Sequence, residues 1–195
     1  MAYEFDLFIS YRRAGNVRDW VQRHLHPVLE ACLEDELPEP PRIKIDTKIE
    51  TGAAWPTDLK RALQRSKYML AVWSAPYFTS PWCVAEWRTM VERERLLGFR
   101  TLGNPRGLVL PVLFADGDYY PQLARDTQGR IDFRAWSYPD EVFSTTPEYL
   151  RFRDAVRSLA QEIAGRLNEA PDWADNWPAV TPPVENAPAA RLPEL

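Results

Sequence analysis

Cysteine, histidine and glycine are scarce in this sequence of 195 residues. The two cysteines, Cys32 and Cys83, fall in predicted helices, and we expect both to be free thiols in a reducing compartment. The two histidines, His24 and His26, stand in one predicted helix without the spacing of a metal site, so we expect no bound metal. The eight glycines stand singly, which excludes a glycine-rich phosphate loop.

Long apolar runs and a positive charge excess are also missing. No apolar stretch approaches the roughly 18 residues of a membrane span, and the start of the chain has no signal-peptide pattern, so we expect a cytoplasmic protein without membrane contact. A net charge of -4 argues against nucleic-acid binding. The 45% hydrophobic content is typical of one soluble globular domain with a full core.

Short apolar runs alternate with helical patterns, which predicts an α/β protein with a parallel sheet. The predicted strands are 5–11, 43–46, 68–73, 108–114 and a weaker one, 131–136, which we expect at a sheet edge. The predicted helices span 21–32, a short stretch around 59–63, residues 81 to about 97 behind a Ser80 N-cap, and a last helix opened by Thr146 and Pro147.

The composition changes at about residue 170. Six prolines fall within the last 26 residues, without helical or strand periodicity. We therefore predict a domain over residues 1–169 and a proline-rich, largely disordered tail over 170–195. Trp173 and Trp177 are an exception, because tryptophans are costly to leave in water. They dock on the domain or on a partner, and we favour the domain.

Glu86 is placed unusually for a charged residue. It falls in the second turn of its predicted helix, on an apolar face with Trp82, Cys83 and Met90. A carboxylate in such surroundings is costly unless it is paired or has a function. Two interpretations follow: a salt bridge to one of the many arginines, or a catalytic role.

Candidate polar residues follow the first three predicted strands. They lie in the stretches 11–13, 46–55 and 74–86. The carboxyl ends of parallel strands meet at one edge of the sheet, and ligands of open α/β sheets bind there, near the switch in strand order. This convergence favours the functional interpretation of Glu86.

Three separated motifs resemble the signature boxes of the Toll/interleukin-1 receptor (TIR) domain family. The first, Tyr3–Arg13, resembles that family's opening DxFISY strand, and the second, Arg42–Trp55, resembles its second strand and BB loop. The third, Ser80–Glu86, resembles the tryptophan-cysteine-x-x-glutamate helix of members that cleave NAD. The resemblance covers roughly residues 3–168 and implies a flavodoxin-like fold, with a five-stranded parallel sheet and helices on both faces.

The same resemblance implies an activity. Members of this kind break the nicotinamide–ribose bond of NAD+, which makes NAD+ a substrate, and no cofactor is implied. Glu86 matches the catalytic glutamate, and one carboxylate suffices because nicotinamide leaves as a neutral molecule. Trp82, one turn earlier, is either a stacking surface for the nicotinamide riboside or a plain core residue.

An arginine pair follows the first motif, as it does in some NAD-cleaving relatives. Arg12 or Arg13 is therefore a candidate ligand of the pyrophosphate, and the sequence does not decide which. The alternative is that either arginine is solvated or pairs with Asp19 or Glu4.

Further residues complete the predicted substrate-binding set. Ser10 and Tyr11 end the first motif, and Trp55 closes the loop where relatives often carry an aromatic residue. Asp46 is either a ribose ligand or a structural cap of that loop. Cys83 is expected to be a small buried residue without nucleophilic function, because no histidine lies nearby in sequence.

A free-standing TIR domain resembles prokaryotic antiviral defence proteins of the Thoeris type. Such proteins make a cyclic ADP-ribose signal or deplete NAD, work as homo-oligomers through TIR–TIR contacts, and serve a separate effector or sensor protein. The rival interpretation is a non-catalytic TIR–TIR interaction module, either a signalling scaffold or a secreted interfering effector. Glu86 favours the enzyme, because non-catalytic relatives often lack this glutamate.

Overall fold

The computed structural model describes residues 2–45, 57–127 and 129–182, and it contains a five-stranded sheet in the order β2-β1-β3-β4-β5. Every neighbouring pair of strands is parallel, as expected from the sequence. The strands are β1 Phe5–Tyr11, β2 Ile43–Ile45, β3 Ser66–Trp73, β4 Val109–Leu113 and β5 Ile131–Asp132. The helices are α1 Gly15–Trp20, α2 His26–Glu36, α3 Thr57–Gln64, α4 Ala75–Thr79, α5 Pro81–Leu96, α6 Gln122–Arg125 and α7 Glu148–Leu167.

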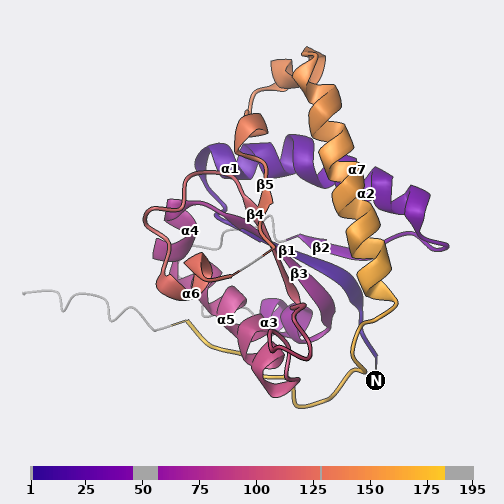
Figure 1. Cartoon of the computed structure of the whole chain (residues 1–195), viewed down its shortest axis with the longest axis vertical. Coiled ribbons are helices and arrows are strands. Elements are labelled where there is room, and N and C mark those ends of the chain that lie inside the picture. The colour runs from indigo at the N-terminus through magenta and orange to yellow at the C-terminus, as the bar shows by residue number, and fades with distance from the viewer. Residues whose placement is uncertain (1, 46–56, 128, 183–195) are drawn as a thin grey trace, which may run out of the picture.

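The two central strands carry the core. β1 and β3 are almost completely buried along their length, because helices cover both faces of the sheet. α1, α2 and α7 lie on one face, and α3, α4 and α5 lie on the other (Figure 1). The chain winds outward from β1 to β2 and then crosses to β3, so the switch in strand order falls between β1 and β3.

The first helical segment contains a feature that the sequence did not reveal. A π-helical turn, Val21–Leu25, separates α1 from α2. The inward-facing residues of the predicted helix remain inward: Val21, Leu25 and Leu29 are buried. The wider turn brings buried His24 against Phe143 and Tyr149, with its Nε2 3.1 Å from the carbonyl of Asp140.

Several element boundaries differ from the prediction. The strand expected over 131–136 ends at Asp132 and continues as a 3-10 turn, Arg134–Trp136, while a second 3-10 turn, Glu141–Thr145, precedes α7. The prediction of an edge position for β5 is correct. α4 was not predicted, although Pro76 near its first turn is a helix-start signal.

Residues 170–182 lie along the α3 and α5 side of the molecule, as the yellow end of the chain in Figure 1 shows. Trp177 is only 8% exposed, and its ring stacks on the guanidinium of buried Arg93 at 4.9 Å. The side-chain amide of Gln64 donates to the carbonyl of Trp177 at 2.7 Å, and the N–H of Val180 donates to the Thr89 hydroxyl at 2.9 Å. Trp177 therefore docks on the domain, the favoured alternative.

Candidate active site

Glu86 is completely buried at the carboxyl edge of the central strands. α5 places it there: the Ser80 hydroxyl accepts the N–H of Cys83 at 3.5 Å, and Pro81 occupies the first turn. The helix then carries Glu86 inward in its second turn, with an exposed fraction of 0%, on the face shared with buried Cys83 and Met90. The buried apolar helix face predicted from the spacing is therefore present, while polar groups from other elements surround the carboxylate itself.

Among the described contacts, Ser10 and Arg13 hold the carboxylate of Glu86. The Ser10 hydroxyl donates to Oε2 at 2.6 Å, and the Arg13 guanidinium pairs with Oε1. Ser10 lies near the end of β1, and Arg13 lies in the loop that follows β1. Both residues are therefore close in sequence to the carboxyl end of a strand that borders the topological switch. The guanidinium and the hydroxyl contact opposite oxygens, so they fix the orientation of the Glu86 carboxyl group.

Tyr77 extends this network, and sequence reasoning missed it. Its hydroxyl lies 2.8 Å from the Ser10 hydroxyl. Because the single proton of Ser10 is directed at Glu86, Tyr77 is the donor of this second bond. Burial, with Cys83 and Glu86 nearby, raises the pKa of Tyr77 well above its ordinary value, which keeps the phenol protonated. The chain Tyr77–Ser10–Glu86 therefore orients the carboxylate.

Cys83 has the character expected of a structural residue. Its thiol is buried and donates to the carbonyl of Tyr11 at 3.5 Å. Burial, with the charge of Glu86 added, raises the pKa of Cys83 to about 12. A thiol with such a pKa does not form the reactive thiolate at neutral pH.

The two arginines after β1 take different positions. Arg13 is bound to Glu86, with 14% of its side chain exposed. Arg12 is exposed, and its guanidinium forms no hydrogen bond or ion pair with the residues that the structure describes. The alternative partners considered for this pair are engaged elsewhere: Asp19 contacts Arg18, and Glu4 contacts Arg61 and Arg65.

Among the described contacts, two other predicted site residues lie apart from this network. Tyr11 points to the opposite face of the sheet, where its hydroxyl accepts from Gln22 at 3.2 Å, because successive side chains of a strand alternate. Trp82 is half-buried on α5, one turn before Glu86. Asp46 and Trp55 lie outside the described residues.

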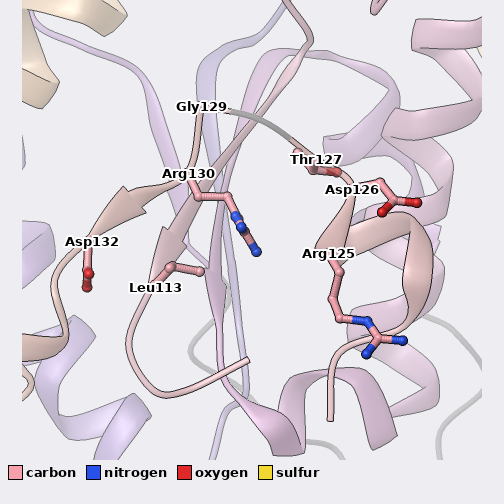
Figure 2. A pocket seen from close by; sticks show the side chains of 7 residues that line it. All are labelled: Leu113, Arg125, Asp126, Thr127, Gly129, Arg130 and Asp132. Atoms are coloured by element: carbon pink, nitrogen blue, oxygen red, sulfur yellow. The ribbon is translucent and has the colours of Figure 1, made fainter. Parts of the chain in front are cut away.

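A pocket of about 660 Å³ lies at the carboxyl ends of β4 and β5. Figure 2 shows Arg130 extending into it from the segment before β5, with Arg125 on α6 across from it. Its remaining lining residues are Leu113, Asp126, Thr127, Gly129 and Asp132. None of these residues belongs to the Glu86 network, which lies two strands away, at β1.

Within the described parts of the chain, no group of three or more histidine, cysteine or acidic side chains has an arrangement suited to a metal ion. In the same parts, no helix combines the length and apolarity needed to cross a bilayer.

The comparison with protein families agrees with the motif assignment. The family model of the TIR domain matches residues 7–145. Among solved structures, the TIR domain of the Toll-related receptor TRR-2 from Hydra magnipapillata is similar at 17% identity and a TM-score of 0.48, covering 77% of this chain and 98% of that one. The TIR domains of the activated Roq1 resistosome, which recognises the pathogen effector XopQ, are similar at 19% identity and a TM-score of 0.40, covering 83% and 84%. No curated protein matches the sequence.

Proposed function

Because the chain belongs to the TIR-domain family, we propose that it cleaves NAD+ at the bond between nicotinamide and ribose, with Glu86 as the catalytic residue. The observation that carries this proposal is the buried carboxylate of Glu86, held by Ser10 and Arg13 beside the strand switch. A buried anion at the ligand-binding edge of an α/β sheet is suited to stabilise a developing positive charge.

The chemistry follows from the charge of the substrate. The bond between the ribose C1′ and the pyridinium nitrogen breaks, and its electron pair neutralises the nitrogen, so nicotinamide leaves without needing a proton. The ribosyl group develops oxocarbenium character, which the negative carboxylate of Glu86 opposes at short range. Water then adds to C1′ and loses a proton, giving ADP-ribose, or a nucleophilic atom of the same ADP-ribosyl group adds instead and gives a cyclic product.

The other members of the network have supporting roles in this proposal. Ser10 and Tyr77 fix the orientation of the Glu86 carboxylate. Arg12 is exposed next to Arg13 in the loop after β1, where it can contribute to binding the pyrophosphate. Trp82 offers a half-buried ring one helical turn from Glu86, and Asp46 and Trp55 keep their predicted roles in ribose binding and at the substrate loop.

The second candidate function is a TIR–TIR interaction module without catalysis. The complete burial of Glu86 favours it, because a carboxylate paired with Arg13 and closed to solvent also fits a purely structural ion pair. Under this alternative the network only joins α5 to β1, and Glu86 never contacts a substrate.

Incubation of the purified protein with NAD+, followed by chromatography of the products, separates the two candidates. Release of nicotinamide with linear or cyclic ADP-ribose supports the enzyme. A folded protein that leaves NAD+ intact over a wide range of protein concentration favours the interaction module. On the enzymatic interpretation, we place the chain in prokaryotic antiviral defence of the Thoeris type, where it makes a cyclic ADP-ribose signal for a separate effector or depletes NAD+.

A further inference from the structure

Substrate cannot reach the carboxylate of Glu86, our proposed catalytic group, in this conformation. Glu86 has no exposed surface, and among the described contacts Ser10 binds its Oε2 and Arg13 its Oε1. A ribose contacts Glu86 only after one of these partners has moved.

The two partners differ in how readily they can move. Ser10 is part of central strand β1, almost fully buried, and its backbone is in register with Ala71 of β3. Arg13 lies in the loop between β1 and α1, with exposed Arg12 before it and exposed Ala14 after it. Its long side chain also reaches solvent, at 14% exposure. Arg13 is therefore the movable partner.

We propose that Arg13 is a latch on Glu86 that the pyrophosphate of the substrate releases. This inference rests on the proposed NAD+ cleavage, and it adds how the pyrophosphate of that substrate gives the ribose access to Glu86. A guanidinium binds phosphate oxygens in bidentate fashion, so a pyrophosphate competes with Oε1 of Glu86 for Arg13. Arg12, exposed next to it, adds a second positive charge on the solvent side.

Release of the latch couples recognition to chemistry. When Arg13 turns to the pyrophosphate, it leaves Oε1 of Glu86, which the ribose can then contact. The hydrogen bond from Ser10 to Oε2 is kept and continues to orient the carboxylate. A substrate without pyrophosphate has to break the ion pair without compensation, so its rate falls as well as its affinity. The binding energy of the pyrophosphate, which is remote from the bond that breaks, is thereby used to free the catalytic carboxylate.

The first test supplies two parts of the substrate, nicotinamide riboside and pyrophosphate, as separate molecules. Wild-type protein should cleave nicotinamide riboside slowly, and added inorganic pyrophosphate should raise that rate by about tenfold, the scale of a modest population shift. Arg13→Gln keeps a hydrogen-bond donor on Glu86 but cannot bind pyrophosphate as a cation, so the stimulation should vanish. Arg18→Gln is the matched control, because Arg18 is an exposed arginine on α1 that pairs with Asp19 outside the Glu86 network, so stimulation should persist. Riboside cleavage that ignores pyrophosphate in the wild type would overturn the latch while leaving NAD+ cleavage standing.

The second test does not depend on catalysis. Calorimetry measures the affinity of inorganic pyrophosphate for the wild type, Glu86→Gln, Arg13→Gln and the double variant, which together form a double-mutant cycle. If Glu86 competes for Arg13, Glu86→Gln should bind pyrophosphate about tenfold more tightly, because Arg13 is then already released. That gain should disappear in the Arg13→Gln background. An equal gain in both backgrounds, which indicates simple charge repulsion, or no gain in either, would refute the latch.

Discussion

The guanidinium of Arg13 and the carboxylate of Glu86 form an ion pair that joins the loop after β1 to the second turn of α5. One partner is completely buried and the other reaches solvent, so the pair links the interior of the domain to its ligand edge. Removing either partner has a different consequence: loss of Arg13 takes a cation away from a buried carboxylate, whereas loss of the Glu86 charge affects a cation with access to water.

Glu86→Gln should remove NAD+ cleavage and leave the fold intact. The amide keeps the size of the side chain but loses the charge that opposes the oxocarbenium ion, so turnover should fall at least a hundredfold, about 3 kcal/mol. Nicotinamide release and the far-UV spectrum are measured together. Glu92→Gln is the control, since Glu92 lies on the same helix and pairs only with exposed Arg95 among the described contacts. Equal turnover of Glu86→Gln and wild type would end the catalytic role.

Ser10→Ala should lower kcat more than Tyr77→Phe does. Ser10 donates directly to the carboxylate, whereas Tyr77 acts only through Ser10. Loss of a hydrogen bond to a charged group costs about 1.5–3 kcal/mol and loss of a neutral one about 1 kcal/mol, and urea unfolding should follow the same order. Ser158→Ala, which removes an exposed hydroxyl on α7, serves as the control. The reverse order of kcat values would show that Tyr77 acts independently of Ser10.

Cys83 should resist thiol reagents in the folded protein at pH 8 and react after unfolding. Its folded pKa is raised from 9.0 to about 12, so the folded state retains a proton that the unfolded chain loses. The contribution of this thiol to stability is therefore constant below the lower value and declines as pH rises between the two, by up to about 1.4 kcal/mol per pH unit. Urea unfolding of wild type and Cys83→Ala between pH 8 and 10 should show a steeper alkaline loss in the wild type. Parallel curves would contradict this prediction.

Trp177 should stabilise the domain, and the end of the chain should not. Deleting residues 183–195 should leave Tm nearly unchanged, as the proline-rich composition predicts. Deleting residues 170–195, or replacing Trp177 by alanine, removes the ring that covers Arg93 and should cost about 3 kcal/mol, or roughly 10 °C in Tm. Differential scanning calorimetry measures the Tm of each variant. The Tm of Trp177→Phe should fall between those of the wild type and Trp177→Ala. Equal Tm values for both truncations would show that the docked segment contributes no stability.

Trp55 should be needed for an active assembly. It lies outside the described residues, and the prediction rests on its place in the loop after the second strand motif. Specific activity should rise with protein concentration, and Trp55→Ala should suppress it. Mixing Glu86→Gln with Trp55→Ala should restore part of the activity, because some neighbours then combine an intact Glu86 with an intact loop. Constant specific activity over a hundredfold dilution, without rescue on mixing, would indicate a self-contained monomer.

The sequence by itself determined the fold and the apolar helix face on which Glu86 lies. β1 and α5 could be placed closely because a continuous apolar run and a Ser-Pro helix start are local signals. The spacing of Trp82, Cys83 and Met90 likewise predicted an apolar face around the carboxylate. Weaker signals failed: the pattern over 131–136 resembles a strand, but the chain turns into a 3-10 helix after Asp132.

Only the tertiary structure decided which groups meet. A sequence with 24 lysines and arginines offers many partners for Glu86, and the selection of Arg13 depends on how β1 packs against α5. The pleat of β1 likewise turns Ser10 toward Glu86 and Tyr11 toward Gln22. The stacking of Trp177 on Arg93 joins the end of the chain to α5. Such contacts depend on the packed positions of distant segments, which local propensity and periodicity do not encode.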